Sequence, residues 1–80
     1  MLTAEEVIQK GEGKKEGEFF KIEKPVFVRC IKEVSHGKVC LTRGQFFTVN
    51  LVGGQESEHR NKLHFKGIYF WWNASCFKIV

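Results

Sequence analysis

The residues that could carry out catalysis are few and widely spaced in this chain. Its acids are all glutamates, since no aspartate occurs, and only Glu33, Glu56 and Glu58 follow residue 23. Its three histidines stand singly. A general acid and base must lie within reach of each other, and a histidine base usually needs a carboxylate to orient it. No glycine-rich phosphate-binding motif is present either. The sequence therefore predicts a non-catalytic protein.

One catalytic alternative stays open. His59, Arg60 and His64, together with a glutamate, would suit acid–base cleavage of RNA, which some small barrel-shaped toxins carry out. The spacing of these residues does not distinguish such a site from ordinary polar surface residues.

The cysteines predict neither a disulfide framework nor a metal site. Cys30, Cys40 and Cys76 are an odd number, and no C-x-x-C spacing occurs. His36 lies four residues before Cys40, but together with Cys30 it forms no recognised ligand pattern. We expect reduced thiols in a cytoplasmic protein that uses no metal and no cofactor.

The charge is unevenly distributed along the chain. Residues 1–23 hold six Glu and four Lys, whereas residues 24–80 hold nine Lys or Arg and three Glu. A basic body of this kind attracts nucleic acid or an acidic protein surface. The longest apolar run, 68–72, is far shorter than the roughly 20 residues of a membrane span, so we expect no membrane partner.

Aromatic residues are the most distinctive feature of the composition. Eight Phe, two Trp and one Tyr occur in a chain of 80 residues, which buries only about 60–65% of its surface on folding. In a strand over 68–72, Phe70 and Trp72 share one face while Tyr69 and Trp71 share the other. One set fills the core. The other is covered by the N-terminal segment or forms a binding surface.

The N-terminal segment predicts a short helix on a flexible tether. Thr3 and Glu6 have the spacing of a capping box, Leu2 and Val7 that of a hydrophobic staple, and Gly11 suits a left-handed C-cap. The stretch 11–18 is glycine-rich and charged, which is typical of a flexible linker. We therefore divide the chain into an N-terminal helix and linker, residues 1–18, and a domain of residues 19–80.

Alternating hydrophobicity predicts strands over most of the second domain. The expected strands cover 26–34, 39–41, 45–52, 63–66, 68–72 and 77–80. Turns are expected at 35–38 and 42–44, a mobile loop or hairpin tip at 55–62, and one turn of tight helix at 73–76. This is the pattern of an all-β fold, either a small closed barrel of about five strands or two orthogonal sheets.

Several of these positions carry a resemblance to a known family. The succession is Val28-x-Cys30-Ile31, then Leu41-Thr42-x-Gly44-x-x-Phe47-x-Val49, then Trp71, then Phe77-x-Ile79-Val80. It resembles small SH3-like β-barrel accessory proteins of bacteriophages and covers about residues 26–80. The helix and tether and the run Tyr69–Trp72 depart from that pattern. The resemblance implies an SH3-like barrel that binds and modulates or inhibits a host protein. It implies no catalytic residues.

The sequence thus predicts a binding surface built from aromatic and basic side chains. Its candidate residues are Trp71, Tyr69 and Phe46, with Arg29, Arg43 and Lys66 beside them. We expect a monomer whose partner is a host protein with an acidic or mixed surface. Nucleic acid is the alternative partner, although the basic residues are scattered along the chain and no nucleic-acid-binding signature occurs.

Overall fold

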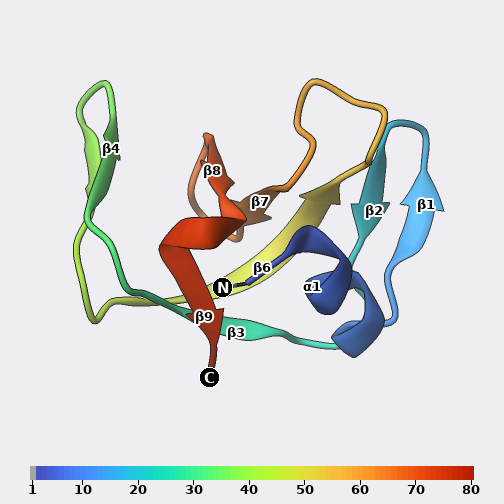
Figure 1. The fold of residues 1–80 in the computed structure, drawn as a ribbon, viewed down its shortest axis with the longest axis horizontal. Coiled ribbons are helices and arrows are strands. Elements are labelled where there is room, and N and C mark those ends of the chain that lie inside the picture. The colour runs from blue at the N-terminus through green and yellow to red at the C-terminus, as the bar shows by residue number, and fades with distance from the viewer. Residues whose placement is uncertain (1) are drawn as a thin grey trace.

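The computed structural model describes residues 2–80, which form mainly short antiparallel strands (Figure 1). The elements in chain order are α1 (Ala4–Lys10), β1 (Lys14–Glu16), β2 (Phe19–Lys21), β3 (Phe27–Cys30), β4 (Val34–His36), β5 (Val39–Leu41), β6 (Phe46–Gly53), β7 (Lys62–Phe65), β8 (Trp71–Asn73), the 3₁₀ helix η1 (Ala74–Cys76) and β9 (Phe77–Ile79). The expectation of a mostly β fold with one short N-terminal helix is confirmed.

The longest strand, β6, organises the main sheet. Its first half pairs with β3, placing Phe46 opposite Arg29, and its second half pairs with β2. It also pairs with β7, which pairs in turn with β8. A register shift in the β6–β7 pairing between Val49 and Leu51 marks a bulge, which increases the local bend of a sheet. The last strand, β9, returns to pair with β3.

The sheet does not close into a barrel, so the expectation of a closed barrel of about five strands was wrong. The strand path runs β1-β2-β6-β3-β9, with β7 and β8 branching from β6. Within residues 2–80, β9 pairs only with β3 and β8 only with β7. The turn of η1 redirects the chain between β8 and β9, and both strands are only three residues long. Short edges of this kind offer little template for further strand pairing.

The N-terminal helix is fixed by the signals that its sequence carries. The Thr3 hydroxyl accepts the Glu6 amide at 3.4 Å, and the Glu6 carboxylate accepts the Thr3 amide at 3.2 Å. This is the expected capping box. Asn61 adds a long-range support, because its side-chain oxygen accepts the Ala4 amide at 3.0 Å. The helix therefore begins at a point that also contacts the turn before β7.

The end of α1 differs from the expected left-handed glycine cap. Gly11 has φ −93°, and it is Glu12 that adopts the left-handed conformation at φ 50°. Gly11 serves close packing instead, since a Cβ there would lie 2.9 Å from Val26 Cγ2. Its carbonyl accepts the amides of Glu23 and Lys24 at 3.0 and 2.9 Å. The helix end is thereby joined directly to the segment that leads into β3.

The segment 11–18 is a hairpin arm rather than the expected flexible tether. Its strand β1 pairs with β2, with Lys15 opposite Phe20, and Gly17 takes φ 66° in the connecting turn. The Gly54 amide donates to the Glu18 carbonyl at 2.9 Å, so the turn is also bound to the end of β6. Composition suggested a linker, but backbone pairing to β2 fixes this stretch.

The core lies on the inner face of the sheet, and α1 packs against the part of it beside β6 (Figure 1). Val7 of α1 is fully buried, and the helix contacts β6. The helix and the strands thus contribute to one hydrophobic core, although the sequence suggested two separate units. The buried residues are Leu2, Ala4, Val7, Val26, Val28, Cys30, Leu41, Val49, Val52, Leu63, Phe65, Trp72, Ala74, Cys76 and Phe77.

Two expected strands are shorter in the structure. The run 26–34 breaks after Cys30, and Val34 begins the separate β4–β5 hairpin. Of residues 68–72 only the last two belong to β8, because the chain turns before them. Gly67 adopts φ 79° in this turn, and the Ile68 amide donates a hydrogen bond to the Phe65 carbonyl. The one-turn helix after Asn73 and the closing strand β9 are confirmed.

Candidate functional site

Strand alternation gives the main sheet an outer face that the helix leaves uncovered. Along β3, Val28 and Cys30 point into the core, while Phe27 is 54% exposed and Arg29 is exposed. Along β6, Phe46 is 62% exposed, whereas Val49 is buried. The structure therefore places an apolar surface on the side of the sheet opposite its core.

Cross-strand register brings six of these outward side chains together. Arg29 lies opposite both Phe46 on β6 and Lys78 on β9. The Val80 amide donates to the Phe27 carbonyl at 3.0 Å, which places Val80 beside Phe27. Lys66 joins them, since its amide donates to the Thr48 carbonyl at 3.0 Å and Thr48 lies opposite Phe27. We name this surface the outer patch: Phe27, Arg29, Phe46, Lys66, Lys78 and Val80.

A hollow with two arginines adjoins the outer patch. Arg29, Cys30, Ile31, Arg43 and Gly44 line an open depression of about 320 Å³. The turn that carries Arg43 is held against the end of β3 by two backbone bonds: the Gly44 amide donates to the Cys30 carbonyl at 2.9 Å, and the Cys30 amide donates to the Gln45 carbonyl at 2.8 Å. We call this depression the arginine hollow.

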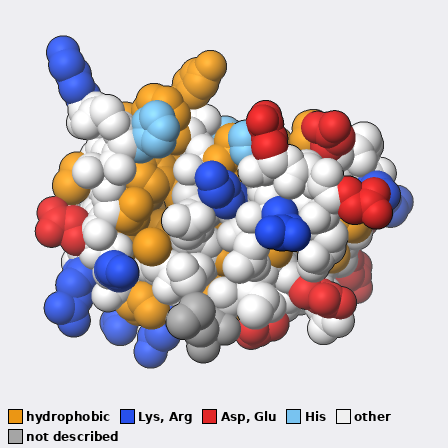
Figure 2. Space-filling model, turned by 45° about the horizontal axis from the view of Figure 1, so that its top comes forward, with side chains coloured by type: hydrophobic (Ala, Val, Ile, Leu, Met, Phe, Trp, Pro, Cys, Tyr) orange, Lys and Arg blue, Asp and Glu red, His pale blue; other side chains and the backbone are white. Residues whose placement is uncertain are grey.

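The outer patch carries three basic side chains, Arg29, Lys66 and Lys78, and no acidic side chain. The ion pairs found within residues 2–80 join Lys14 to Glu23, Lys24 to Glu12 and His59 to Glu58. None of them engages a cation of the outer patch or of the arginine hollow. Acidic side chains gather instead over the 54–61 loop and β1–β2, at the right of Figure 2. The apolar centre of the patch therefore has a basic rim.

The predicted site residues divide into two groups. Phe46, Arg29 and Lys66 meet in the outer patch, and Arg43 lies in the adjoining hollow. Trp71 and Tyr69 lie elsewhere, on β8 and on the turn before it. Sequence reasoning did not include Phe27, Lys78 and Val80 in the site. The alternation of side chains along a strand could have identified Phe27, because it places Phe27 on the face opposite Val26 and Val28. Both valines are fully buried in the structure.

Trp71 is half-buried and packs against other rings of the chain. The His59 ring stacks on its indole with centroids 4.4 Å apart and planes 7° apart. His64 and Phe19 approach it at 5.4 and 6.5 Å. The two histidines of the nuclease alternative thus both pack against one indole. The spacing of residues in the sequence did not reveal this packing, because His59 lies in the β6–β7 loop and Trp71 lies in β8.

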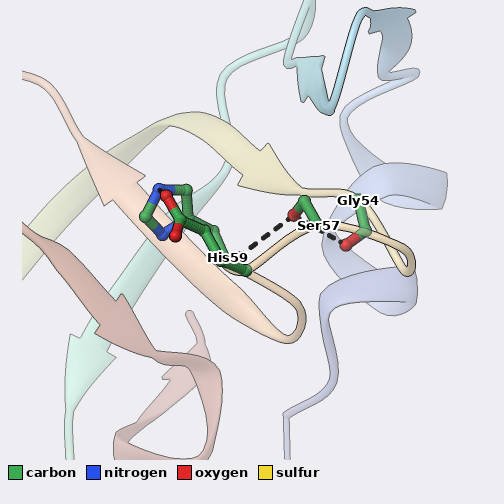
Figure 3. Close-up of polar contacts among 4 residues, drawn as sticks. Gly54, Ser57 and His59 are labelled. Atoms are coloured by element: carbon green, nitrogen blue, oxygen red, sulfur yellow. Dashed lines mark hydrogen bonds and ion pairs between the residues drawn. The ribbon is translucent and has the colours of Figure 1, made fainter.

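A short loop positions His59, and Figure 3 shows its bonds. The Ser57 hydroxyl donates to the Gly54 carbonyl at 3.0 Å and accepts the His59 amide at 3.1 Å. Gly53 permits the close approach, because a Cβ at this position would overlap the backbone carbonyl of His59. The segment expected to be a mobile loop or a hairpin tip is the tip of the β6–β7 hairpin, and these hydrogen bonds order it.

A smaller aromatic surface surrounds Tyr69, which is 78% exposed. Phe70 stacks on His36 at 4.0 Å and contacts Tyr69 at 5.2 Å. Figure 2 shows hydrophobic side chains with a histidine between the β4–β5 hairpin and β8. This surface fixes the hairpin to the sheet. It contains one strongly exposed ring, whereas the outer patch contains two rings and Val80.

The cysteines differ in environment and in ionisation. Burial raises the pKa of Cys30, and the nearby positive charge of Arg43 opposes that shift. Cys40 is exposed, and its thiol donates to the Glu33 carboxylate at 3.4 Å. That hydrogen bond to Glu33 raises the pKa of Cys40, because it stabilises the thiol form. Among residues 2–80 no three His, Cys or Glu side chains gather as a metal site.

Glu33→Gln should accelerate alkylation of Cys40. A raised pKa leaves less thiolate at a given pH, and the thiolate is the reactive form. Removing the carboxylate lowers the pKa, so the rate of iodoacetamide labelling at pH 8 rises and its pH profile moves to lower pH. Cys30 and Cys76 are buried and should react only after unfolding, which provides an internal control. Identical Cys40 rates in both proteins would contradict the Glu33 contact.

Within residues 2–80 no helix has the length and apolar character needed to cross a membrane. Comparisons of the chain with protein-family models, with curated proteins and with solved structures find no match.

Proposed function

We propose that this protein is a non-catalytic protein-binding module and that the outer patch is its recognition surface. One observation carries the proposal: within residues 2–80 the exposed large hydrophobic residues are Phe27, Ile31, Phe46, Tyr69 and Val80, and all except Tyr69 lie in or directly after β3, β6 and β9. Contiguous exposed apolar surface marks interaction sites, whereas isolated exposed residues carry no such meaning. The helix already covers the inner face, so the outer face is the one that an external molecule would cover.

The composition of the patch suits a protein partner. Protein interfaces have an apolar centre rich in aromatic residues, arginine among the enriched polar residues, and a polar rim. Phe27 and Phe46 supply that centre, with Arg29 and Lys78 beside it. A partner with an acidic or mixed surface would complement the charge of the rim.

The course of the strands supports an SH3-like relationship as part of this proposal. Strand β6 pairs with β2, β3 and β7, β7 pairs with β8, and after the turn of η1 the last strand pairs with β3. Together with the sequence pattern, this order leads us to propose an SH3-like fold whose sheet stays open. On that basis we extend the proposal to a bacteriophage accessory protein that binds and modulates or inhibits a host protein in the host cytoplasm, acting as a monomer.

Nucleic acid is the second candidate ligand. The basic side chains are scattered in sequence but gather in the fold, with Arg29, Lys66 and Lys78 around two exposed phenylalanine rings. Single-stranded nucleic acid binds to such combinations of aromatic stacking and positive charge. Affinity of this type falls steeply as the salt concentration rises, because each phosphate contact releases counterions.

Phe46→Ser should weaken partner binding at least tenfold while leaving the fold intact. Because the ring is 62% exposed, its loss opens no core cavity. Peptides selected from a displayed random library on the immobilised protein supply the probe, and fluorescence anisotropy measures their affinity. Tyr69→Ser removes an even more exposed ring outside the patch and is the matched control.

Three results would oppose the proposal. The first is a library that yields no peptide. The second is selected peptides that depend on Tyr69 and not on Phe46. The third is a labelled oligothymidylate that binds more tightly than any peptide and loses affinity steeply with salt, which would instead support the nucleic-acid function.

A further inference from the structure

The arginine hollow presents two guanidinium groups at the end of the outer patch. Arg29 reaches it from β3, and Arg43 comes from the turn before β6. These residues lie 14 apart in sequence, and the backbone bonds at Cys30 bring them to one depression. Neither arginine forms an ion pair within residues 2–80. The depression is therefore lined by two arginines that have no ion-pair partner within residues 2–80.

One acid, Glu33, lies near this end of β3, where its charge acts on Cys30, but it forms no ion pair with either arginine. The Glu33 carboxylate accepts the thiol of the exposed Cys40 at 3.4 Å. The other hollow-lining residues, Cys30, Ile31 and Gly44, bring no charge of their own, since the Cys30 thiol donates to the Lys32 carbonyl at 3.1 Å. An anion entering the hollow would meet two guanidinium groups that are suited to bidentate contact with a carboxylate.

Apolar surface begins directly beside the hollow. Phe46 lies opposite Arg29 in the β3–β6 register and is 62% exposed, and Ile31 is 38% exposed at the edge of the depression. A ligand that fills the hollow with a charged group therefore places its neighbouring groups on apolar side chains. This juxtaposition selects for a ligand that combines negative charge with an apolar side chain a few ångströms away.

The geometry points to the arginine hollow as a subsite for a carboxylate of an acidic peptide segment whose adjacent apolar side chain packs on Phe46. This inference rests on the proposed protein-binding function and specifies its partner. A peptide fits better than a nucleic-acid strand because the two arginines converge on one depression. A phosphodiester backbone needs cations spaced along a track.

The test measures the affinity of the peptides selected on the intact protein, before and after the charge of Arg43 or of the acidic residue in the peptide is removed. Selected sequences should be enriched in Asp or Glu next to a Leu, Ile or Phe. Arg43→Gln should weaken the tightest peptide about tenfold. Replacing the acidic residue of the peptide by its amide should weaken binding to the wild-type protein by the same factor as Arg43→Gln. The amide peptide and the Arg43→Gln protein together should bind little more weakly than with either change alone. Arg60→Gln, an exposed arginine on the 54–61 loop, is the matched control and should leave affinity unchanged.

The outcomes separate this inference from the function on which it rests. Peptides that depend on Phe46 but are insensitive to Arg43→Gln would overturn the carboxylate subsite and leave the protein-binding function standing. Peptides that are insensitive to Phe46→Ser would remove the function itself. Additive losses in the double change, or displacement of the peptide by an oligothymidylate but not by excess free acidic peptide, would also overturn the subsite.

Discussion

Val7→Asp should destabilise the whole protein by more than about 3 kcal/mol, which is a large part of its total stability. Val7 is fully buried where α1 meets the sheet. Placing an unpaired carboxylate there costs several kcal/mol, and the lost apolar burial adds to that cost. A domain of 80 residues has a total stability of only about 4–12 kcal/mol. Urea denaturation followed by circular dichroism gives the free energy of unfolding.

Gln9→Asp is the control for this substitution. It introduces the same carboxylate into the same helix at an exposed position, so the free energy of unfolding should change by less than about 1 kcal/mol. If Val7→Asp also left stability unchanged, α1 would be an appendage, as its short length suggests, and not the cover of the inner face.

Trp72→Ala should cost about 3–5 kcal/mol, and Trp71→Ala no more than about half of that. Trp72 is 2% exposed and packs edge-on against Phe70, with ring centroids 6.4 Å apart. Its removal leaves a large cavity in the core. Trp71 lies on the outer side of the same strand, where its ring is only half-buried. The two adjacent tryptophans therefore test which side of β8 faces the core and which faces outward.

Trp72→Phe sharpens the comparison between the two tryptophans. The Trp72 indole N–H is buried without a hydrogen-bond partner, and such a donor is costly. Phenylalanine retains most of the packing and removes the donor, so this variant should lose far less stability than Trp72→Ala. Equal losses for Trp71→Ala and Trp72→Ala, measured by denaturation, would contradict the assignment of the two faces.

The features that the sequence predicted well depend on neighbouring residues. Thr3 and Glu6 are three apart and form their capping box within one turn. The turn 35–38 and the one-turn helix after Asn73 are likewise specified by a few consecutive residues. Alternation also identified Phe46 and Phe47 as lying on opposite faces, and only Phe46 is strongly exposed.

The features that the sequence missed depend on contacts between distant segments. Local composition marks 11–18 as flexible, but pairing with β2 orders it, and Gly11 is needed for close packing against Val26 rather than for a left-handed cap. Register decides the candidate site in the same way. Lys78 faces Arg29 only because β9 returns to β3, and Trp71 leaves the predicted site because His59 stacks on it.

The most direct test of the central claim is amide chemical-shift mapping of the ¹⁵N-labelled protein during titration with a selected peptide. The claim is that β3, β6 and β9 present the recognition surface while α1 covers the opposite face. We expect the largest shifts at Phe27, Arg29, Phe46 and Lys78, with α1 and the 54–61 loop unaffected. Shifts confined to the surroundings of Trp71 and His59, or to α1, would contradict the claim.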